Sequence, residues 1–166
     1  MKKYILLLIV PLLFFNSCKN SKDDLVFGTI NFTGDEQGYS FEQDKVYEMS
    51  SSWIKEGKRL NNIDIGWSDF NLATPKYSTN DIIDFRLHHM GVVDFNDLVS
   101  FEVDSDDYWT FAYGADDGSH EFIDEVFILK THKDTYVKLI VKNINIKRKA
   151  IEIEYVHQLN GTKTFK

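Results

Sequence analysis

The chain has 166 residues, a formal net charge of −7 at pH 7 and a single cysteine. This length corresponds to one domain, and 43% hydrophobic residues are enough to bury a core without a disulfide or a structural metal. One cysteine excludes an internal disulfide. The acidic balance argues against nucleic acid as a partner, because phosphate binding requires clustered Lys and Arg.

The first residues have the pattern of an export signal. Lys2 and Lys3 precede an apolar run over residues 4–15, and the chain turns polar from Lys19 onward. The run is too short for a transmembrane helix, which needs about 20 apolar residues, and it has the length of a signal-peptide core. The sequence therefore predicts a signal peptide over residues 1–17.

The sequence around the cysteine, Phe15-Asn16-Ser17-Cys18, resembles the lipobox of bacterial lipoproteins. The resemblance implies cleavage before Cys18, acylation of its thiol, a short tether over residues 18–24 and a single β-rich domain over residues 25–166. Acyl chains would anchor the protein in a lipid bilayer, because each buried methylene contributes about 0.8 kcal/mol. The acidic tether resembles that of surface-exported lipoproteins, which implies the outer membrane, on its periplasmic or cell-surface face. The alternative is an ordinary secretory signal with an incidental cysteine.

The rest of the chain is organised in short β-rich runs separated by turn residues. In chain order these runs cover residues 25–32, 40–49, 63–70, 82–88, 98–103, 125–130, 135–146 and 151–159. Residues 50–57 and 94–98 are candidates for short helices. The pattern predicts an all-β, antiparallel fold, either a meander or sandwich or a partly closed barrel, with one or two short helices.

The clearest strand is the last long one. Ile151, Ile153 and Tyr155 alternate with charged residues, which is the pattern of a half-buried strand. The dipeptide Asn160-Gly161 follows and is a strong hairpin signal, because both residues tolerate positive φ. The sequence therefore predicts that residues 162–166 return as an edge strand.

The C-terminal part resembles the HmuY family of haem-binding lipoproteins, in which an apolar strand ends in Thr, a Lys follows an aromatic residue, and a Gln-x-Asn-Gly turn closes the domain. The matching residues here are Thr131, Tyr136, Lys138, Tyr155, Gln158, Asn160 and Gly161. A second match runs from Tyr39 to Val46 and then resumes at Ile63-Asp64-Ile65. The resemblance implies a β-rich fold, an exposed lipoprotein and haem as a candidate ligand, but it supplies no ligand residues.

The cluster His88-His89-Met90 offers the side chains that haem iron takes as axial ligands. Neighbouring strand residues point to opposite faces, so His88 and Met90 are expected to share a side while His89 faces away. A second ligand would come from His120, His132 or His157. The alternative is a polar strand end with a buried Met. His157 alternates in phase with the apolar residues of its strand, so we expect a hydrogen-bonded histidine in the core or at its rim.

Two further patterns have both a functional and a structural interpretation. The acidic runs at residues 104–107 and 116–118 could bind Ca²⁺, but they lack the spacing of the helical calcium loop and are typical of solvated loops. Trp109, Phe111 and Tyr113 alternate and could line a binding groove or pack between two sheets.

No nucleophile elbow, zinc-protease, Walker or dinucleotide motif occurs in the sequence, so we expect no enzyme. The leading hypothesis is a membrane-anchored binding protein whose ligand is a small molecule, haem among them. The alternative is an envelope interaction or inhibitor protein, or an accessory subunit of an outer-membrane complex. An acid–base hydrolase comes third. A concave apolar pocket with His or Met at its mouth favours the first, a flat aromatic patch the second, and two converging carboxylates the third.

Overall fold

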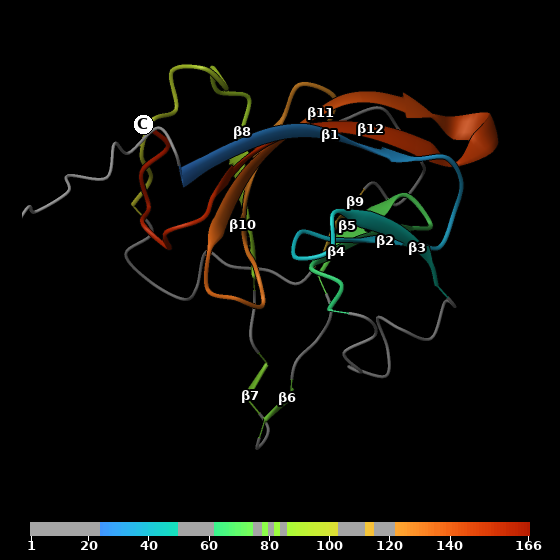
Figure 1. Cartoon of the computed structure of the whole chain (residues 1–166). Helices are drawn as coiled ribbons and strands as arrows, with labels where there is room; N and C mark the ends of the chain where they lie inside the picture. Colours follow the sequence, from blue (N-terminus) through green and yellow to red (C-terminus); the bar gives the residue numbers. More distant parts are fainter. Residues whose placement is uncertain are drawn as a thin grey trace, which may run out of the picture.

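The computed structural model describes residues 24–49, 62–74, 78–79, 82–83, 86–102, 112–114 and 122–166. Two antiparallel five-stranded sheets face each other in a sandwich (Figure 1). The predicted all-β fold is therefore confirmed, and the sheets do not join into a closed barrel within this part of the chain. No described helix is long and apolar enough to cross a membrane.

The first sheet joins the two ends of the chain. Its strands, in spatial order, are β1 (Leu25–Phe32), β12 (Ala150–Gln158), β11 (Tyr136–Asn145), β10 (Val126–Lys130) and β8 (Leu87–Gly91). In sequence, β10, β11 and β12 follow one another. The turns that join them lie where the predicted runs end, at residues 131–135 and around the short 3₁₀ helix η3 (Ile146–Arg148). Among the described strands, the first in sequence thus pairs with the last.

The second sheet is built from shorter strands. Its spatial order is β3 (Lys45–Glu48), β2 (Gln37–Ser40), β4 (Ile65–Ser68), β5 (Asn71–Ala73) and β9 (Ala112–Gly114). A separate two-stranded hairpin joins β6 (Ser78–Thr79) and β7 (Ile82–Ile83). The predicted run at residues 82–88 is therefore divided between β7 and β8.

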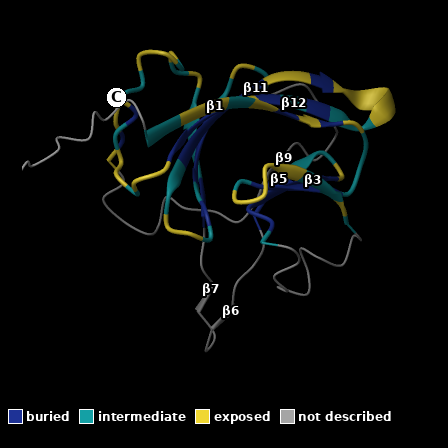
Figure 2. Ribbon diagram, in the orientation of Figure 1, coloured by how far each residue is buried: buried dark blue, intermediate teal, exposed yellow. Residues whose placement is uncertain are grey.

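The main core lies between the two sheets, where Figure 2 shows the buried residues. The strand β12 contributes Ile151 and Ile153 to it, as its alternation predicts, and the second sheet contributes the fully buried Trp67. A second apolar cluster covers the opposite face of the first sheet, and we call it the outer cluster. It contains Phe101, Ile128, Val156 and Phe165, with Leu25, Met90, Phe95, Leu98 and Tyr136 packed against it.

The predicted C-terminal hairpin is wrong. The strand β12 is paired on one side with β1 and on the other with β11, so neither of its edges is open to residues 162–166. The chain still turns at Gly161, whose φ is 74°, but it then crosses to form an isolated bridge between Thr164 and Ser100. The Gln158 side chain holds this crossing by donating to the Thr164 carbonyl at 2.6 Å.

The two expected short helices have different outcomes. Residues 50–57 lie outside the described residues. Residues 94–98 form a single turn closed by the Leu98 N–H and the Asp94 carbonyl at 3.0 Å, which is not a helix. The predicted strand at residues 98–103 is reduced to the bridge at Ser100. Both segments cover the outer face of the first sheet instead of extending a sheet.

Candidate functional site

The histidines and methionine predicted as haem ligands lie on the edge strand β8. His88 is opposite Ile128 and Met90 packs on the outer cluster, so both occupy the outer face of the first sheet. His89 lies on the inner face, with its ring 5.0 Å from that of Phe127 and its Nε2 2.7 Å from Glu125 Oε2. The expected alternation is present, but none of the three pockets described below is lined by these residues.

Several other predicted residues lie outside the described part of the chain. These are Cys18, His120, Trp109, Phe111 and the acidic runs at residues 104–107 and 116–118. Tyr113 lies in β9. Within the described ranges no group of three or more His, Cys, Asp and Glu could hold a metal ion.

The structure instead brings His132 and His157 to one pocket of about 250 Å³, which we call the histidine pocket. The turn between β2 and β3, the start of β4, the turn between β10 and β11, and the end of β12 all contribute to it. Its lining residues are Phe41, Glu42, Asp64, Thr131, His132, Lys133, Thr135, His157 and Leu159. These segments are far apart in sequence, so the pocket exists only when both sheets are in place.

Asp64 and Glu42 hold the ring of His132 between them. Asp64 Oδ1 lies 2.6 Å from His132 Nδ1, and Glu42 Oε2 lies 3.0 Å from its Nε2. Asp64 also accepts the backbone N–H groups of His132 at 2.8 Å and Phe41 at 2.9 Å, and is 2% exposed. These donors occupy both carboxylate oxygens, so Asp64 acts as a fixed acceptor that joins the two sheets.

A chain of hydroxyl groups fixes the second histidine. Thr131 Oγ1 accepts the N–H groups of Lys133 and Thr135, so its own proton is left to donate to Thr135 Oγ1 at 2.7 Å. Thr135 Oγ1 lies 2.7 Å from His157 Nε2, and once this oxygen accepts from Thr131 its own proton is available to that ring nitrogen. In this arrangement the ring proton of His157 is on Nδ1, which has no partner among the described residues. Burial lowers the pKa of His157, which is consistent with a neutral ring.

The two carboxylates of the pocket do not form a hydrolase pair. Hydrogen bonds from Lys133 and His132 lower the pKa of Glu42, whereas a glycosidase acid requires a raised pKa. Asp64 has its oxygens occupied by backbone and imidazole donors. The pocket therefore holds a buried and a solvated carboxylate, and of these Glu42 has its pKa moved in the direction opposite to that of a catalytic acid.

A larger groove of about 760 Å³ lies on the outer face of the first sheet, and we call it the outer groove. Phe27 and Thr29 of β1 and the turn at residues 94–96 border it, and Lys138 lies at its floor. Lys138 is 4% exposed and donates to the carbonyls of Phe95 and, at 2.8 Å, Leu98. Desolvation lowers the pKa of Lys138, whose ammonium ties the turn to the sheet.

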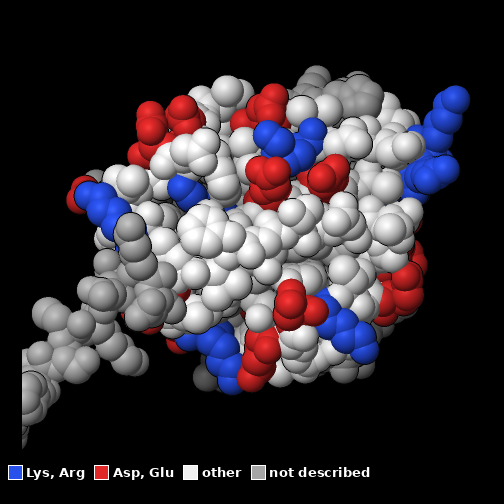
Figure 3. Space-filling view, turned by 45° about the horizontal axis from the view of Figure 1, so that its top comes forward, with Lys and Arg blue, Asp and Glu red and all other residues white. Residues whose placement is uncertain are grey.

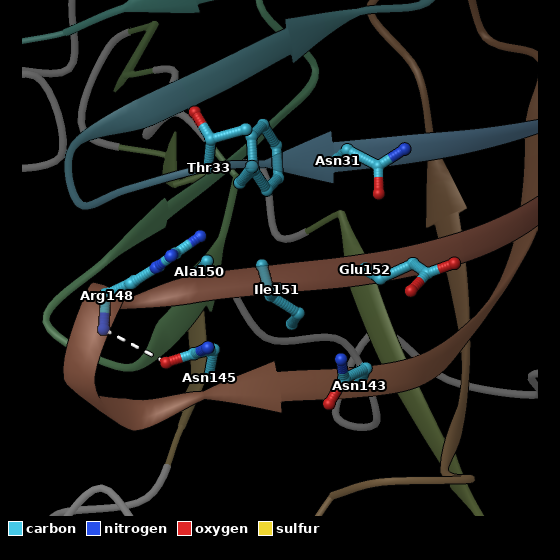
Figure 4. A pocket seen from close by; sticks show the side chains of 9 residues that line it. Asn31, Thr33, Asn143, Asn145, Arg148, Ala150, Ile151 and Glu152 are labelled. Atoms are coloured by element: carbon cyan, nitrogen blue, oxygen red, sulfur yellow. Dashed lines mark hydrogen bonds between the residues drawn. The ribbon is translucent and has the colours of Figure 1, made fainter.

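A smaller pocket of about 210 Å³ lies at the far end of this face, between the ends of β1, β11 and β12 (Figure 4). Three of its nine lining residues are asparagines, Asn31, Asn143 and Asn145. Asn145 caps the η3 turn by accepting the Arg148 backbone N–H at 3.1 Å. The lining of this end pocket contains one hydroxyl, from Thr33, and one carboxylate, from Glu152, and no histidine or cysteine.

Haem binding requires a cavity large enough for the macrocycle and an axial ligand for the iron at the same place. The described residues do not combine these two features. The outer groove is large enough for a flat macrocycle, but no His, Met or Cys lines it, and the Tyr155 hydroxyl lies on the inner side, 3.3 Å from that of Tyr39. The histidine pocket has imidazoles but room for only roughly eight to ten non-hydrogen atoms, since one water occupies about 30 Å³. The groove and the imidazoles are separate.

Sequence reasoning missed the histidine pocket, although each of its residues was visible. Asp64 is part of a strand-like Ile-Asp-Ile run, and all three residues are buried in the structure. A carboxylate in such an apolar run indicates a hydrogen-bonded site, because a buried charge requires donors. The residues of the HmuY resemblance turn out to have structural roles: Thr131 organises a turn, Lys138 holds the 94–98 segment and Gln158 holds the C-terminus.

No family model matches the chain, and no curated protein matches it. Among solved structures, the chain is similar to the crystal structure of the apo HmuY analog of Tannerella forsythia, with 11% sequence identity and a TM-score of 0.48. The similarity covers 81% of this chain and 96% of that one. At this identity and score the likeness does not assign the chain to a family.

Proposed function

We propose that this chain is a lipid-anchored, non-enzymatic binding protein of the bacterial cell envelope, and that it holds a small, mostly apolar ligand in the histidine pocket. The observation that carries the binding proposal is a concave pocket in which the imidazole of His157, 7% exposed, keeps its Nδ1 without a partner in the described part of the chain. Nδ1 is not one of the buried atoms without a partner, so it faces the solvent of the pocket, where a ligand atom could replace water.

The surroundings of His157 suggest the chemistry of the ligand. The ring presents an N–H donor, so the ligand would supply an oxygen or nitrogen acceptor. Phe41 packs edge-on against the imidazole, with ring centroids 5.2 Å apart, and Leu159 lines the same pocket, which favours an uncharged ring beside the acceptor. A phenol-sized molecule meets both conditions and fits the volume.

Anchoring is the second part of the proposal and rests on the lipobox resemblance at Cys18. Acylation there would place the domain at the outer membrane, on its periplasmic or cell-surface face, within a few residues of the bilayer. Radiolabelled palmitate incorporation into the full chain, and its loss in Cys18→Ser, is the expected result. Equal labelling of both chains would contradict the anchor.

The binding test is a titration of the full chain with phenol, followed by the imidazole proton signals of His157 in NMR spectra. We expect saturable shifts of the His157 signals and of the Leu159 backbone amide, and loss of the Leu159 shifts in His157→Gln, which keeps a polar group near Thr135. The matched control is His88→Gln, because His88 lies on the outer face of β8 and outside the pocket. Unchanged His157 signals at saturating phenol would contradict the proposal.

Haem is tested separately, by adding hemin to the same protein and recording the Soret band. A saturable shift near one equivalent would support haem as the ligand, and single replacement of the candidate ligands would then identify the residues that bind iron. These candidates are His88, His89, Met90, His120, His132 and His157. A spectrum like that of free hemin would exclude haem and leave the small-ligand proposal unaffected.

A further inference from the structure

The strand β1 is an edge strand without the usual protection. No strand of the described chain pairs with its outer edge. Its sequence, Leu-Val-Phe-Gly-Thr-Ile-Asn-Phe, contains no charged residue and no proline, whereas native sheets usually place Lys or Pro on an open edge to prevent pairing. Phe27, 71% exposed, and Val26, 41% exposed, add apolar surface to this edge. An uncovered edge of this kind is a template for another strand.

The hydrogen-bond pattern shows which backbone groups are available. The Leu159 N–H donates to the Asp24 carbonyl at 2.8 Å, in register with the pairs Val26 with His157 and Gly28 with Tyr155. Hydrogen-bonded pairs alternate along an antiparallel ladder, so the even-numbered residues of β1 bond to β12. The odd-numbered residues therefore direct their N–H and C=O groups away from β12. These residues are Leu25, Phe27, Thr29 and Asn31.

The two ends of β1 carry opposite charges. Asp24 directly precedes the strand, and Arg148 lines the end pocket together with Phe32 and Thr33 at its other end. Figure 4 shows the Arg148 side chain extending from its turn toward Thr33. In Figure 3, Lys and Arg atoms project at the end of the molecule where Figure 1 draws η3. Antiparallel pairing of two such strands would place the acidic end of each beside the basic end of the other.

We propose that β1 is a dimer interface at which a second copy of this chain adds its own β1 in antiparallel orientation. Pairing about a two-fold axis matches the same donors and acceptors on both copies and brings Asp24 of one copy to Arg148 of the other. The first sheets of the two copies then form one continuous sheet. The outer groove, which Phe27 and Thr29 border, adjoins the interface on each copy.

The test is sedimentation equilibrium of the full chain in a density-matched nonionic detergent. We expect twice the monomer mass, and we expect Thr29→Lys to raise the dimer dissociation constant by about tenfold or more, because two lysines would face each other near the axis. Glu154→Lys is the matched control: Glu154 is the β12 partner of Thr29 on the same face, one strand away from the edge, and the variant should remain dimeric. A monomeric wild-type chain, or a dimer that survives Thr29→Lys, would overturn the proposal.

A charge exchange tests the orientation of the two strands. Asp24→Arg and Arg148→Asp should each weaken the dimer, and the double variant should recover most of the loss. A double variant weaker than either single variant would exclude antiparallel pairing. Near-ultraviolet circular dichroism of each variant establishes that the fold is intact, so a loss of mass reports on association.

Discussion

Asp64 and His132 are 68 positions apart in the sequence, and Asp64 Oδ1 lies 2.6 Å from His132 Nδ1. The carboxylate belongs to the segment that enters the second sheet, and the imidazole belongs to the turn between β10 and β11 of the first. One buried side chain therefore connects the two sheets at the mouth of the histidine pocket. The pair fixes the geometry on which both stability and the proposed binding depend.

Replacement of Asp64 by Asn should destabilise the protein by about 2–4 kcal/mol, because an amide cannot accept the backbone N–H groups of Phe41 and His132 and the His132 ring together. Urea unfolding followed by tryptophan fluorescence measures the change. Asp97→Asn is the control, since Asp97 is exposed and its replacement should stay within about 0.5 kcal/mol. Equal stability of the two variants would show that the Asp64 contacts contribute little.

Stability should decrease as the pH falls below about 6.5, in part because of His157. Burial lowers the pKa of this group from its ordinary value of 6.5, so below that pH the unfolded chain binds a proton that the folded chain does not. The contribution is complete above the unfolded pKa and is lost toward the lower folded pKa. Urea midpoints between pH 5 and pH 8 should show a shallower pH dependence in His157→Gln than in the wild-type chain; parallel curves would argue against this assignment.

Gly28→Ala should destabilise the protein by about 1–3 kcal/mol, because a Cβ at this position would lie 2.5 Å from the Tyr155 ring. The Tyr155 ring would have to shift, which would disturb the 3.3 Å contact between its hydroxyl and that of Tyr39. Gly34→Ala is the matched control, since the nearest atom to its Cβ is 4.0 Å away. Thermal unfolding distinguishes the two variants, and a similar effect in both would contradict the close packing at Gly28.

Lys138→Met should cost about 1–3 kcal/mol and loosen residues 94–98, because the carbonyls of Phe95 and Leu98 would lose their ammonium donor while buried. Amide hydrogen exchange should increase in this segment in particular. Lys142→Met on the same strand is the control: Lys142 is 37% exposed and its ion pair with Asp124 is 3.6 Å long, so its loss should have little effect. Unchanged exchange in Lys138→Met would assign the segment's order to apolar packing alone.

Local patterns predicted the strands well. The bounds of β1 are those expected from its apolar composition, and the alternation of Ile151, Ile153 and Tyr155 places them on the core face of β12. His157 is buried and hydrogen-bonded, as its phase in the same strand predicted. Strand bounds and the alternation of side chains depend on residues that are close together in the sequence, so a local pattern is enough to predict them.

Long-range pairing could not be predicted in the same way. The Asn160-Gly161 turn is present, but the hairpin is not, because β1 occupies the edge of β12 that residues 162–166 would have used. The histidine pocket likewise depends on which strands meet, since Thr135 and His157 come together only through the pairing of β11 with β12. Strand order is a property of the whole chain and no local signal encodes it.

The position of β12 between β1 and β11 has a consequence for how the molecule is made. A ribosome releases β1 first and β12 last, so the earliest strand waits, without its only described neighbour, until synthesis is almost complete. The second sheet contains neither strand and can form earlier, whereas the first sheet cannot incorporate β1 until that moment. Premature termination anywhere before residue 150 would leave the nascent first strand unpaired and prone to join foreign sheets.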